Sequence, residues 1–299
     1  MIEVSVVVCA RNEEARIGRQ LAALDAQVDH PTFEVIVVDD GSTDRTRDVV
    51  GAWIERGGGA AESAHLLHGK SRRGIPASRN RGAGRARGRL IAYCDADDEV
   101  DPEWVGAMAR GLGPEQVGGG PLLVPAAEGR GGFAAFADGP VSTAYLPYIG
   151  AASLVIERTA LHRLGGFDES LPPYGFEDVD LCWRAQEAGM ELVRIADARV
   201  RYSLSGASAS VRKKLTLGRG RVLMARRYPR YDPATYTLPS TLTGLAGAVA
   251  GTVAASARGR RIDRRRAGTA VAAAGRVIGA LQVPASRPLP PPRLPLEAL

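Results

Sequence analysis

The chain has few of the residues on which several classes of protein depend. Of its 299 residues only three are cysteine, and aromatic residues make up 5%. The cysteines, at positions 9, 94 and 182, cannot all pair with one another, and no CxxC spacing indicates a zinc site. We therefore expect reduced, buried thiols and exclude a disulfide-stabilised scaffold.

The scarcity of aromatic residues also argues against a nucleic-acid-binding protein. The net charge of +6 and the pI of about 9.5 would suit a polyanion or a membrane surface. However, the chain has no recognition motif for DNA or RNA and few side chains that could stack on bases. Only three basic residues are lysine, and the other 36 are arginine, a bias that weakens any single arginine cluster as evidence. We expect no nucleic-acid partner.

No signal peptide is visible at the N-terminus, because residues 1–3 lead directly into an apolar, β-branched run. We therefore expect a cytoplasmic catalytic part. Residues 4–9, 33–38 and 90–94 have the continuous apolar character of strands that are buried on both faces. Segments with helical spacing of apolar residues separate them, including a helix that we expect over 79–87. This alternation predicts an α/β fold with a mainly parallel sheet flanked by helices.

The last third of the chain changes character. No charged residue occurs between Pro233 and Ala257. The larger apolar residues of this stretch fall on one helical face: Leu238, Leu242, Leu245, Val249 and Val253. The stretch could span a bilayer by length alone, but its proline and many small or polar residues oppose insertion. We expect a helical hairpin that packs on the catalytic domain, with at most peripheral contact at the inner face of the membrane.

These patterns divide the chain into three parts. We assign residues 1–206 to a catalytic domain, 207–283 to a helical appendage, and 284–299 to a proline-rich tail that is extended or disordered.

Three acidic motifs lie in the first part: Asp39-Asp40-Gly41-Ser42, Asp95-Ala96-Asp97-Asp98 and Glu177-Asp178-Val179-Asp180. The first two close predicted strands, and open α/β sheets bind ligands at the carboxyl ends of their strands. Carboxylates clustered at that edge suit a divalent cation that carries a diphosphate. Simpler interpretations exist for each motif alone, namely a strand-end turn, an acidic loop and an acid pair favoured by a helix N-terminus.

The chain resembles the family 2 inverting glycosyltransferases of the GT-A fold. Six segments carry the resemblance, in the order that the family shows: residues 8–14 (VCARNEE), 38–44 (VDDGSTD), 78–82 (SRNRG), 95–98 (DADD), 165–169 (GGFDE) and 177–181 (EDVDL). The resemblance covers about residues 1 to 205. It implies a nucleoside-diphosphate-sugar donor, a divalent cation (Mn²⁺ or Mg²⁺), a hydroxyl acceptor and one carboxylate base.

The resemblance also assigns roles to individual residues. The loop after the first strand and the second aspartate of the Asp-Asp-Gly-Ser turn would hold the nucleotide base, which implicates Ala10, Arg11, Glu13 and Asp40. A carboxylate there can accept the imide N–H of uracil or thymine. The donor site would further include Arg73, Asn80, Asp95 and Ala96.

The metal and the base complete the expected site. Asp97 is the expected direct ligand of the cation, and Asp95 would contact the ribose or the metal. Asp178, beside Glu177, matches the position of the base that takes the proton of the acceptor hydroxyl.

One position departs from the family pattern. Many relatives carry a metal-binding histidine after the late strand, where this chain has Tyr202, and no histidine follows His162. A third protein ligand for the metal is therefore not expected from that position. Two alternatives to hydroxyl transfer stay open: transfer to a polyprenyl phosphate at the membrane, and binding of a nucleotide-sugar without turnover.

Overall fold

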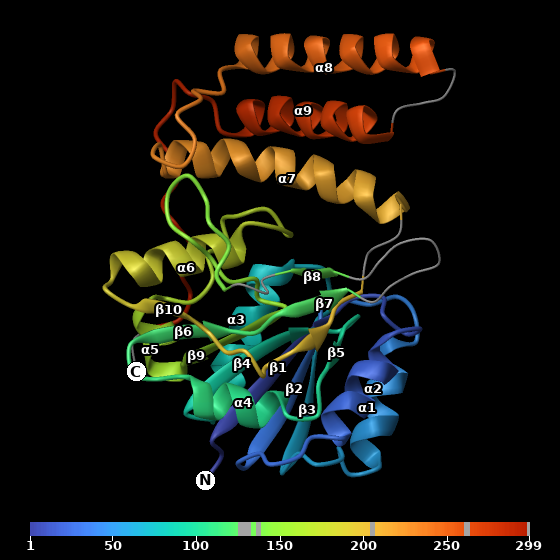
Figure 1. Cartoon of the computed structure of the whole chain (residues 1–299), viewed down its shortest axis with the longest axis vertical. Coiled ribbons are helices and arrows are strands. Elements are labelled where there is room, and N and C mark those ends of the chain that lie inside the picture. The colour runs from blue at the N-terminus through green and yellow to red at the C-terminus, as the bar shows by residue number, and fades with distance from the viewer. Residues whose placement is uncertain (125–132, 136–138, 204–206, 260–263, 298–299) are drawn as a thin grey trace.

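Four parallel strands form the centre of the computed structural model, which describes residues 1–124, 133–135, 139–203, 207–259 and 264–297. They are β1 (Val4–Ala10), β2 (Phe33–Asp39), β3 (Ser63–His68) and β4 (Leu90–Asp95), in the order β4-β1-β2-β3. The predicted α/β architecture with a mainly parallel sheet is confirmed (Figure 1).

The sheet continues beyond β4 with strands from later in the chain. These are β9 (Ser153–Glu157), β6 (Gln116–Gly119) and β10 (Glu191–Arg194), and β9 runs antiparallel to both of its neighbours. A second, small sheet joins β5 (Glu99–Val100), β11 (Val200–Arg201), β7 (Leu122–Val124) and β8 (Phe133–Ala135). This second sheet brings the segment after β4 close to the segment before residue 203.

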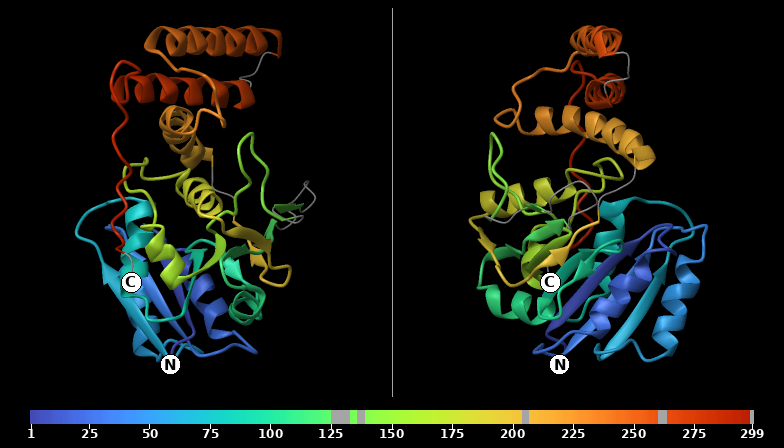
Figure 2. Two further views of the ribbon diagram at one scale, coloured as in Figure 1. Left: turned by 90° about the vertical axis from the view of Figure 1, so that its left-hand side faces the viewer. Right: turned by 45° about the vertical axis from the view of Figure 1, so that its right-hand side comes forward.

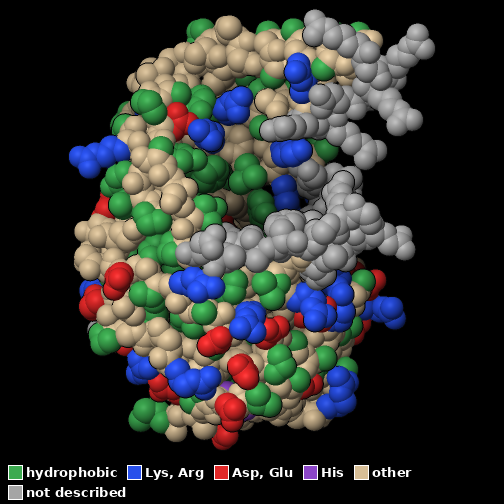
Figure 3. Space-filling view, in the orientation of Figure 1, with side chains coloured by type: hydrophobic (Ala, Val, Ile, Leu, Met, Phe, Trp, Pro, Cys, Tyr) green, Lys and Arg blue, Asp and Glu red, His purple; other side chains and the backbone are tan. Residues whose placement is uncertain are grey.

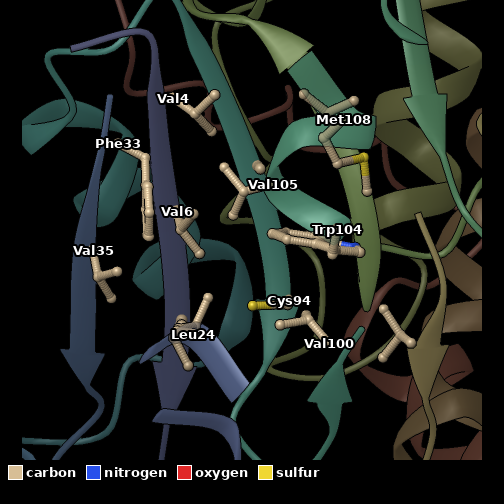
Figure 4. Close-up of a cluster of buried hydrophobic side chains, with 14 of the residues drawn as sticks. Val4, Val6, Leu24, Phe33, Val35, Cys94, Val100, Trp104, Val105 and Met108 are labelled. Atoms are coloured by element: carbon tan, nitrogen blue, oxygen red, sulfur yellow. The ribbon is translucent and has the colours of Figure 1, made fainter. Parts of the chain in front are cut away.

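Helices cover both faces of the central sheet because alternate strand residues point to opposite sides. Val4, Val6 and Val8 pack in one core cluster with α1 (Ile17–Asp25), α2 (Thr46–Glu55) and α4 (Trp104–Gly111). Figure 4 shows part of this cluster, including Trp104 and Met108 of α4. Val7 points the other way, into a cluster with α3 (Ile75–Arg85), α5 (Arg158–Arg163) and α6 (Glu177–Glu187).

One helix boundary differs from the sequence prediction. The helix expected over 79–87 is α3, which begins at Ile75 and ends at Arg85. Pro76 lies in its first turn, where a missing N–H costs nothing, and Gly74 before it has φ 96°. The early start brings Arg79 into the second turn of the helix.

Three long helices form the C-terminal part: α7 (Ala207–Arg227), α8 (Leu238–Gly259) and α9 (Arg264–Gln282). They lie in layers, with α7 nearest the catalytic domain, α9 above it and α8 outermost (Figures 1 and 2). The expected helical hairpin therefore forms, but α7 lies between it and the catalytic domain.

Most of the predicted apolar stripe of α8 is exposed, which corrects the expectation that it packs on protein, and of its five residues only Leu245 is half-buried. Leu238, Leu242, Val249 and Val253 are exposed, and Val253 retains 63% of its accessible surface. The more buried side of α8 carries Thr241 and Ala248, and such small residues permit close helix approach. By length and composition Leu238–Ala257 could cross a membrane, and only 6% of that window is buried, so α8 is not a core helix. Apolar side chains lie along its outer edge (Figure 3).

The proline-rich tail is extended and returns to the catalytic domain (Figure 2). The Leu296 amide donates to the Gly165 carbonyl at 3.2 Å, and the Arg293 amide donates to Asp168 at 2.8 Å. The tail thus lies against the Gly-Gly-Phe-Asp-Glu motif.

Candidate active site

The carboxyl ends of β1, β2 and β4 meet at one edge of the sheet. In the parallel register Ala10 lies beside Asp39, and Cys9 lies beside Asp95. The loops that follow these strands therefore converge, as the acidic motifs predict.

A pocket opens at this edge. Seven of the predicted residues line it: Ala10, Arg11, Glu13, Asp40, Asp95, Ala96 and Asp97. The pocket is also lined by Arg72, Ser78, Tyr174, Tyr202 and Lys213. The Nε of Arg11 is buried and has no hydrogen-bond partner among the described residues. A bound anion would satisfy this donor.

Asp40 organises the loop that forms one side of the pocket. Its carboxylate accepts the amides of Arg73 at 2.6 Å and Gly74 at 2.9 Å. Each carboxylate oxygen has a second lone pair, so Asp40 can still accept from a ligand.

Arg73 and Asn80 lie outside the lining of this pocket. The Arg73 side chain is exposed and pairs with Glu169 at 3.0 Å, while its neighbour Arg72 lines the pocket. Asn80 is buried and makes two reciprocal hydrogen bonds with the backbone of Phe167, each 2.8 Å long. In this structure Asn80 therefore links α3 to the Gly-Gly-Phe-Asp-Glu segment.

Three carboxylates after β4 could hold a cation. The candidate ligand atoms of Asp95, Asp97 and Asp98 all lie within 4.8 Å of one another. Asp98 is 1% exposed, and its Oδ2 has no hydrogen-bond partner among the described residues. Burial, and next the charge of Asp95, raise the pKa of Asp98 to about 8. A hard divalent cation prefers such oxygen ligands and would relieve this repulsion, so the residues fit the expected metal.

Burial and the charge of Asp95 also raise the pKa of Asp97, while the cations Arg16 and Lys213 act in the opposite direction. Arg16 lies 3.2 Å from Asp97. The negative charge of Asp95, Asp97 and Asp98 is thus partly offset by Arg16 and Lys213.

The acidic pair Glu177-Asp178 begins α6, directly after Phe176, whose φ is 73°. Glu177 is buried and accepts a hydrogen bond of 2.7 Å from Arg79. Arg79 also donates to Asp95 at 3.3 Å, so it connects the acidic pair to the metal triad. Arg79 lies in the segment 78–82 that resembles the family, but a single arginine indicates no role in a chain that has 36 of them.

Asp178 faces a second pocket, whose lining also includes Tyr148, Ala151 and Phe176. Asp95, Tyr174 and Tyr202 line both pockets, so the two pockets are adjacent. Burial, and next the charge of Glu177, raise the pKa of Asp178 to about 7, against the opposing effect of Arg79. A carboxyl with such a pKa suits proton abstraction near neutral pH.

Tyr202, which the family resemblance aligns with a metal-binding histidine, lines both pockets. Burial, and next the charge of Asp95, raise the pKa of its hydroxyl. The neutral hydroxyl can donate a hydrogen bond into either pocket.

Family comparisons match the catalytic part of the chain. Residues 5–119 match the model described as glycosyl transferase family 2, and residues 133–205 match the model described as N-terminal domain of galactosyltransferase. The first part of the chain is thus similar to the family 2 glycosyltransferases.

Individual relatives are more distant. The chain is 29% identical over 205 residues to a pre-mycofactocin glycosyltransferase of Mycobacterium tuberculosis, covering 64% of this chain and 40% of that one. It is 27% identical over 231 residues to a validoxylamine A glucosyltransferase of Streptomyces hygroscopicus subsp. limoneus. This match covers 63% of this chain and 49% of that one. The chain thus spans less than half the length of these relatives.

Solved structures share the GT-A fold. A mannosyltransferase from Pyrobaculum calidifontis, in complex with GDP-Man and Mn²⁺, has a TM-score of 0.63 at 19% identity and covers 94% of this chain and 87% of that one. S. aureus TarS 1-349, in complex with UDP-GlcNAc, has a TM-score of 0.56 at 20% identity, with coverages of 75% and 67%.

Proposed function

We propose that this protein transfers a sugar from a nucleoside-diphosphate-sugar to a hydroxyl acceptor, with inversion at the anomeric carbon. The observation that carries the proposal is the adjacency of the two pockets. The first holds the carboxylates Asp95 and Asp97, the second holds Asp178, and Asp95 belongs to the walls of both. Donor and acceptor would meet at this shared wall. Relatives and structural neighbours that are glycosyltransferases support the same reaction class.

The donor site would use the first pocket. Arg11, Glu13 and Asp40 would hold the nucleotide, with Ala10 and Ala96 forming the adjoining wall. Arg73 and Asn80 would contribute indirectly, through the loop that Asp40 holds and through the packing of α3.

Asp95 and Asp97, with Asp98 behind them, would hold a divalent cation (Mn²⁺ or Mg²⁺), which supplies positive charge beside the diphosphate.

Asp178 would act as the base. Its carboxylate takes the proton from the acceptor hydroxyl while that oxygen forms its bond to the anomeric carbon. The bond between the anomeric carbon and the diphosphate oxygen breaks, and its electron pair stays with the diphosphate. Attack from the side opposite the leaving group inverts the configuration. The charge of Arg79 would favour the ionised form of Asp178, against the opposing charge of Glu177.

The proposal includes peripheral contact of α8 with the cytoplasmic face of a membrane, with the catalytic domain in the cytoplasm. Its support is the apolar stripe, of which Leu238, Leu242, Val249 and Val253 are exposed. An apolar helix face of this kind suits the boundary between headgroups and acyl chains.

A panel of nucleoside-diphosphate sugars tests the function. A true donor should raise the melting temperature in the presence of Mn²⁺, because a ligand that binds the native state stabilises it by mass action. The same donor should release its nucleoside diphosphate when acceptors are added. No stabilisation by any donor would contradict the proposal, and stabilisation without release under all conditions would favour the non-catalytic alternative.

A further inference from the structure

Helix α7 lies outside both segments that match family models, yet it contributes to both pockets. Lys213 lines the first pocket and Leu217 lines the second. The two residues are one helical turn apart and therefore share a face. A Cβ atom on Gly175 would lie 2.4 Å from Leu217, which shows how closely α7 approaches the loop before α6.

Lys213 is held at the metal side of the first pocket. Its Nζ lies 4.8 Å from the centroid of the Tyr174 ring, and Tyr174 lines both pockets. The ring face attracts a cation and orients it without neutralising its charge. That charge favours the ionised forms of Asp97 and Asp98, although burial and Asp95 outweigh it.

The charge inventory of the pocket indicates what Lys213 faces. The acidic residues in the lining are Glu13, Asp40, Asp95 and Asp97, and the basic ones are Arg11, Arg72 and Lys213. A divalent cation on the aspartates would offset their negative charge, and the basic residues of the lining would then attract an anionic ligand beside that cation. A lysine is a compact point charge on a flexible stem, and in this form it binds phosphate groups.

We propose that Lys213 binds the diphosphate of the donor and stabilises the charge that develops on the departing nucleoside diphosphate. This inference rests on the proposed function. As the bond to the anomeric carbon breaks, its electron pair moves to the diphosphate oxygen, and a cation aimed at that group lowers the barrier. The helical segment assigned to an appendage from the sequence thus supplies a residue of the donor site.

Binding measurements on four proteins test the inference. Wild type, Lys213→Met, Lys213→Arg and the matched control Lys214→Met are titrated calorimetrically with UDP, GDP and dTDP in the presence of Mn²⁺. Lys214 follows directly in the helix but packs over Gly268 of α9, away from the pocket. The diphosphate that wild type binds most tightly is then compared with its parent nucleoside.

We expect Lys213→Met to weaken binding of the nucleoside diphosphate about tenfold or more, the effect of losing one charge-assisted contact. Binding of the nucleoside should not change, because it lacks the diphosphate. Lys213→Arg should keep most of the affinity, and Lys214→Met should match wild type. Equal melting temperatures of the variants without ligand would show that each one folds.

Three outcomes overturn the inference. The first is Lys213→Met binding the diphosphate as tightly as Lys214→Met does. The second is an equal loss for diphosphate and nucleoside, which would mark a packing role. The third is tighter binding in Lys213→Met, which would mean that the lysine competes with the metal. If wild type binds none of the three diphosphates, the proposed function itself fails, and this inference fails with it.

Discussion

At the scale of single residues, Arg79 joins the two halves of the candidate site. Its side chain is 5% exposed and lies between Glu177 at 2.7 Å and Asp95 at 3.3 Å. A buried charge is costly unless it is paired, so these three residues stabilise one another's positions. The positive charge also limits the repulsion that Glu177 imposes on Asp178. One arginine thus connects the expected metal site with the expected base.

Replacing the expected metal ligand tests the metal-binding half of the candidate site. Asp97→Asn removes one carboxylate while keeping the size of the side chain. We expect turnover to fall by two or more orders of magnitude, the scale of losing a group that stabilises transition-state charge, with little change in melting temperature. The exposed Asp48→Asn on α2 is the matched control. Turnover like that of wild type, with metal still required, would refute the role of Asp97.

Replacing the expected base tests the other half of the candidate site, which contains Asp178. Asp178→Asn should leave donor binding intact and lower the rate of transfer by roughly 10²-fold or more. The wild-type rate should fall as the pH drops below about 7, because Asp178, whose pKa is raised to about 7, becomes protonated there and can no longer accept a proton. The variant should lose this pH dependence. A collapse of donor affinity with unchanged transfer per bound donor would instead mark Asp178 as a binding residue.

At the scale of elements, α8 is unusual because its apolar stripe faces outward. A soluble helix normally buries its apolar face against the core. Here the exposed residues include Val249 and Val253, while the more buried side of the helix carries Thr241, Leu245 and Ala248. An outward apolar stripe is what contact with a lipid interface requires.

Vesicle sedimentation checks the contact made by α8. Val249→Ser with Val253→Ser should lower the affinity for anionic phospholipid vesicles about thirtyfold, because each valine contributes about 1 kcal/mol when it is partly buried. Val211→Ser is the control, since this valine is also exposed but lies on α7. Equal sedimentation of all three proteins would contradict peripheral contact. Wild type that resists alkaline washing and needs detergent would show a transmembrane helix instead.

At the scale of the whole molecule, Asp168 ties three parts of the chain together. It is fully buried, pairs with Arg227 at the end of α7, and accepts the amide of Arg293 in the tail at 2.8 Å. Burial opposes its ionisation, but hydrogen bonds from Ser170 and Arg293 and the charge of Arg227 outweigh this effect and lower its pKa. Its stabilising contribution is therefore present above the unfolded-state pKa and is lost as the pH falls.

Asp168→Asn should accordingly destabilise the whole molecule. Breaking a buried ion pair by neutralising one partner costs about 3 kcal/mol, which corresponds to a fall in melting temperature of roughly 5–10 °C. Asp197→Asn is the control, because its pair with Arg199 is exposed on both sides and contributes little. If both variants have the same melting temperature as wild type, Asp168 does not hold these parts together.

Much of this fold and part of the site could be predicted because local patterns encode them. Apolar runs and helical spacing set the order of strands and helices, since side-chain periodicity is a property of consecutive residues. Acidic residues at or shortly after the ends of β1, β2 and β4 converge because parallel strands end at one edge. For the same reason Ala10, Glu13, Asp40 and Asp97 line one pocket.

Only the tertiary structure decided the features that depend on contacts between distant residues. Arg79 reaches Glu177 across 98 positions of sequence, and Lys213 enters the pocket from a helix beyond the family motifs. The exposed side of α8 depends on which face α9 covers, and the role of Asn80 depends on the return of Phe167 to α3. Periodicity shows that one face of a helix is apolar. Which surface this face contacts depends on the packing free energy of the whole chain.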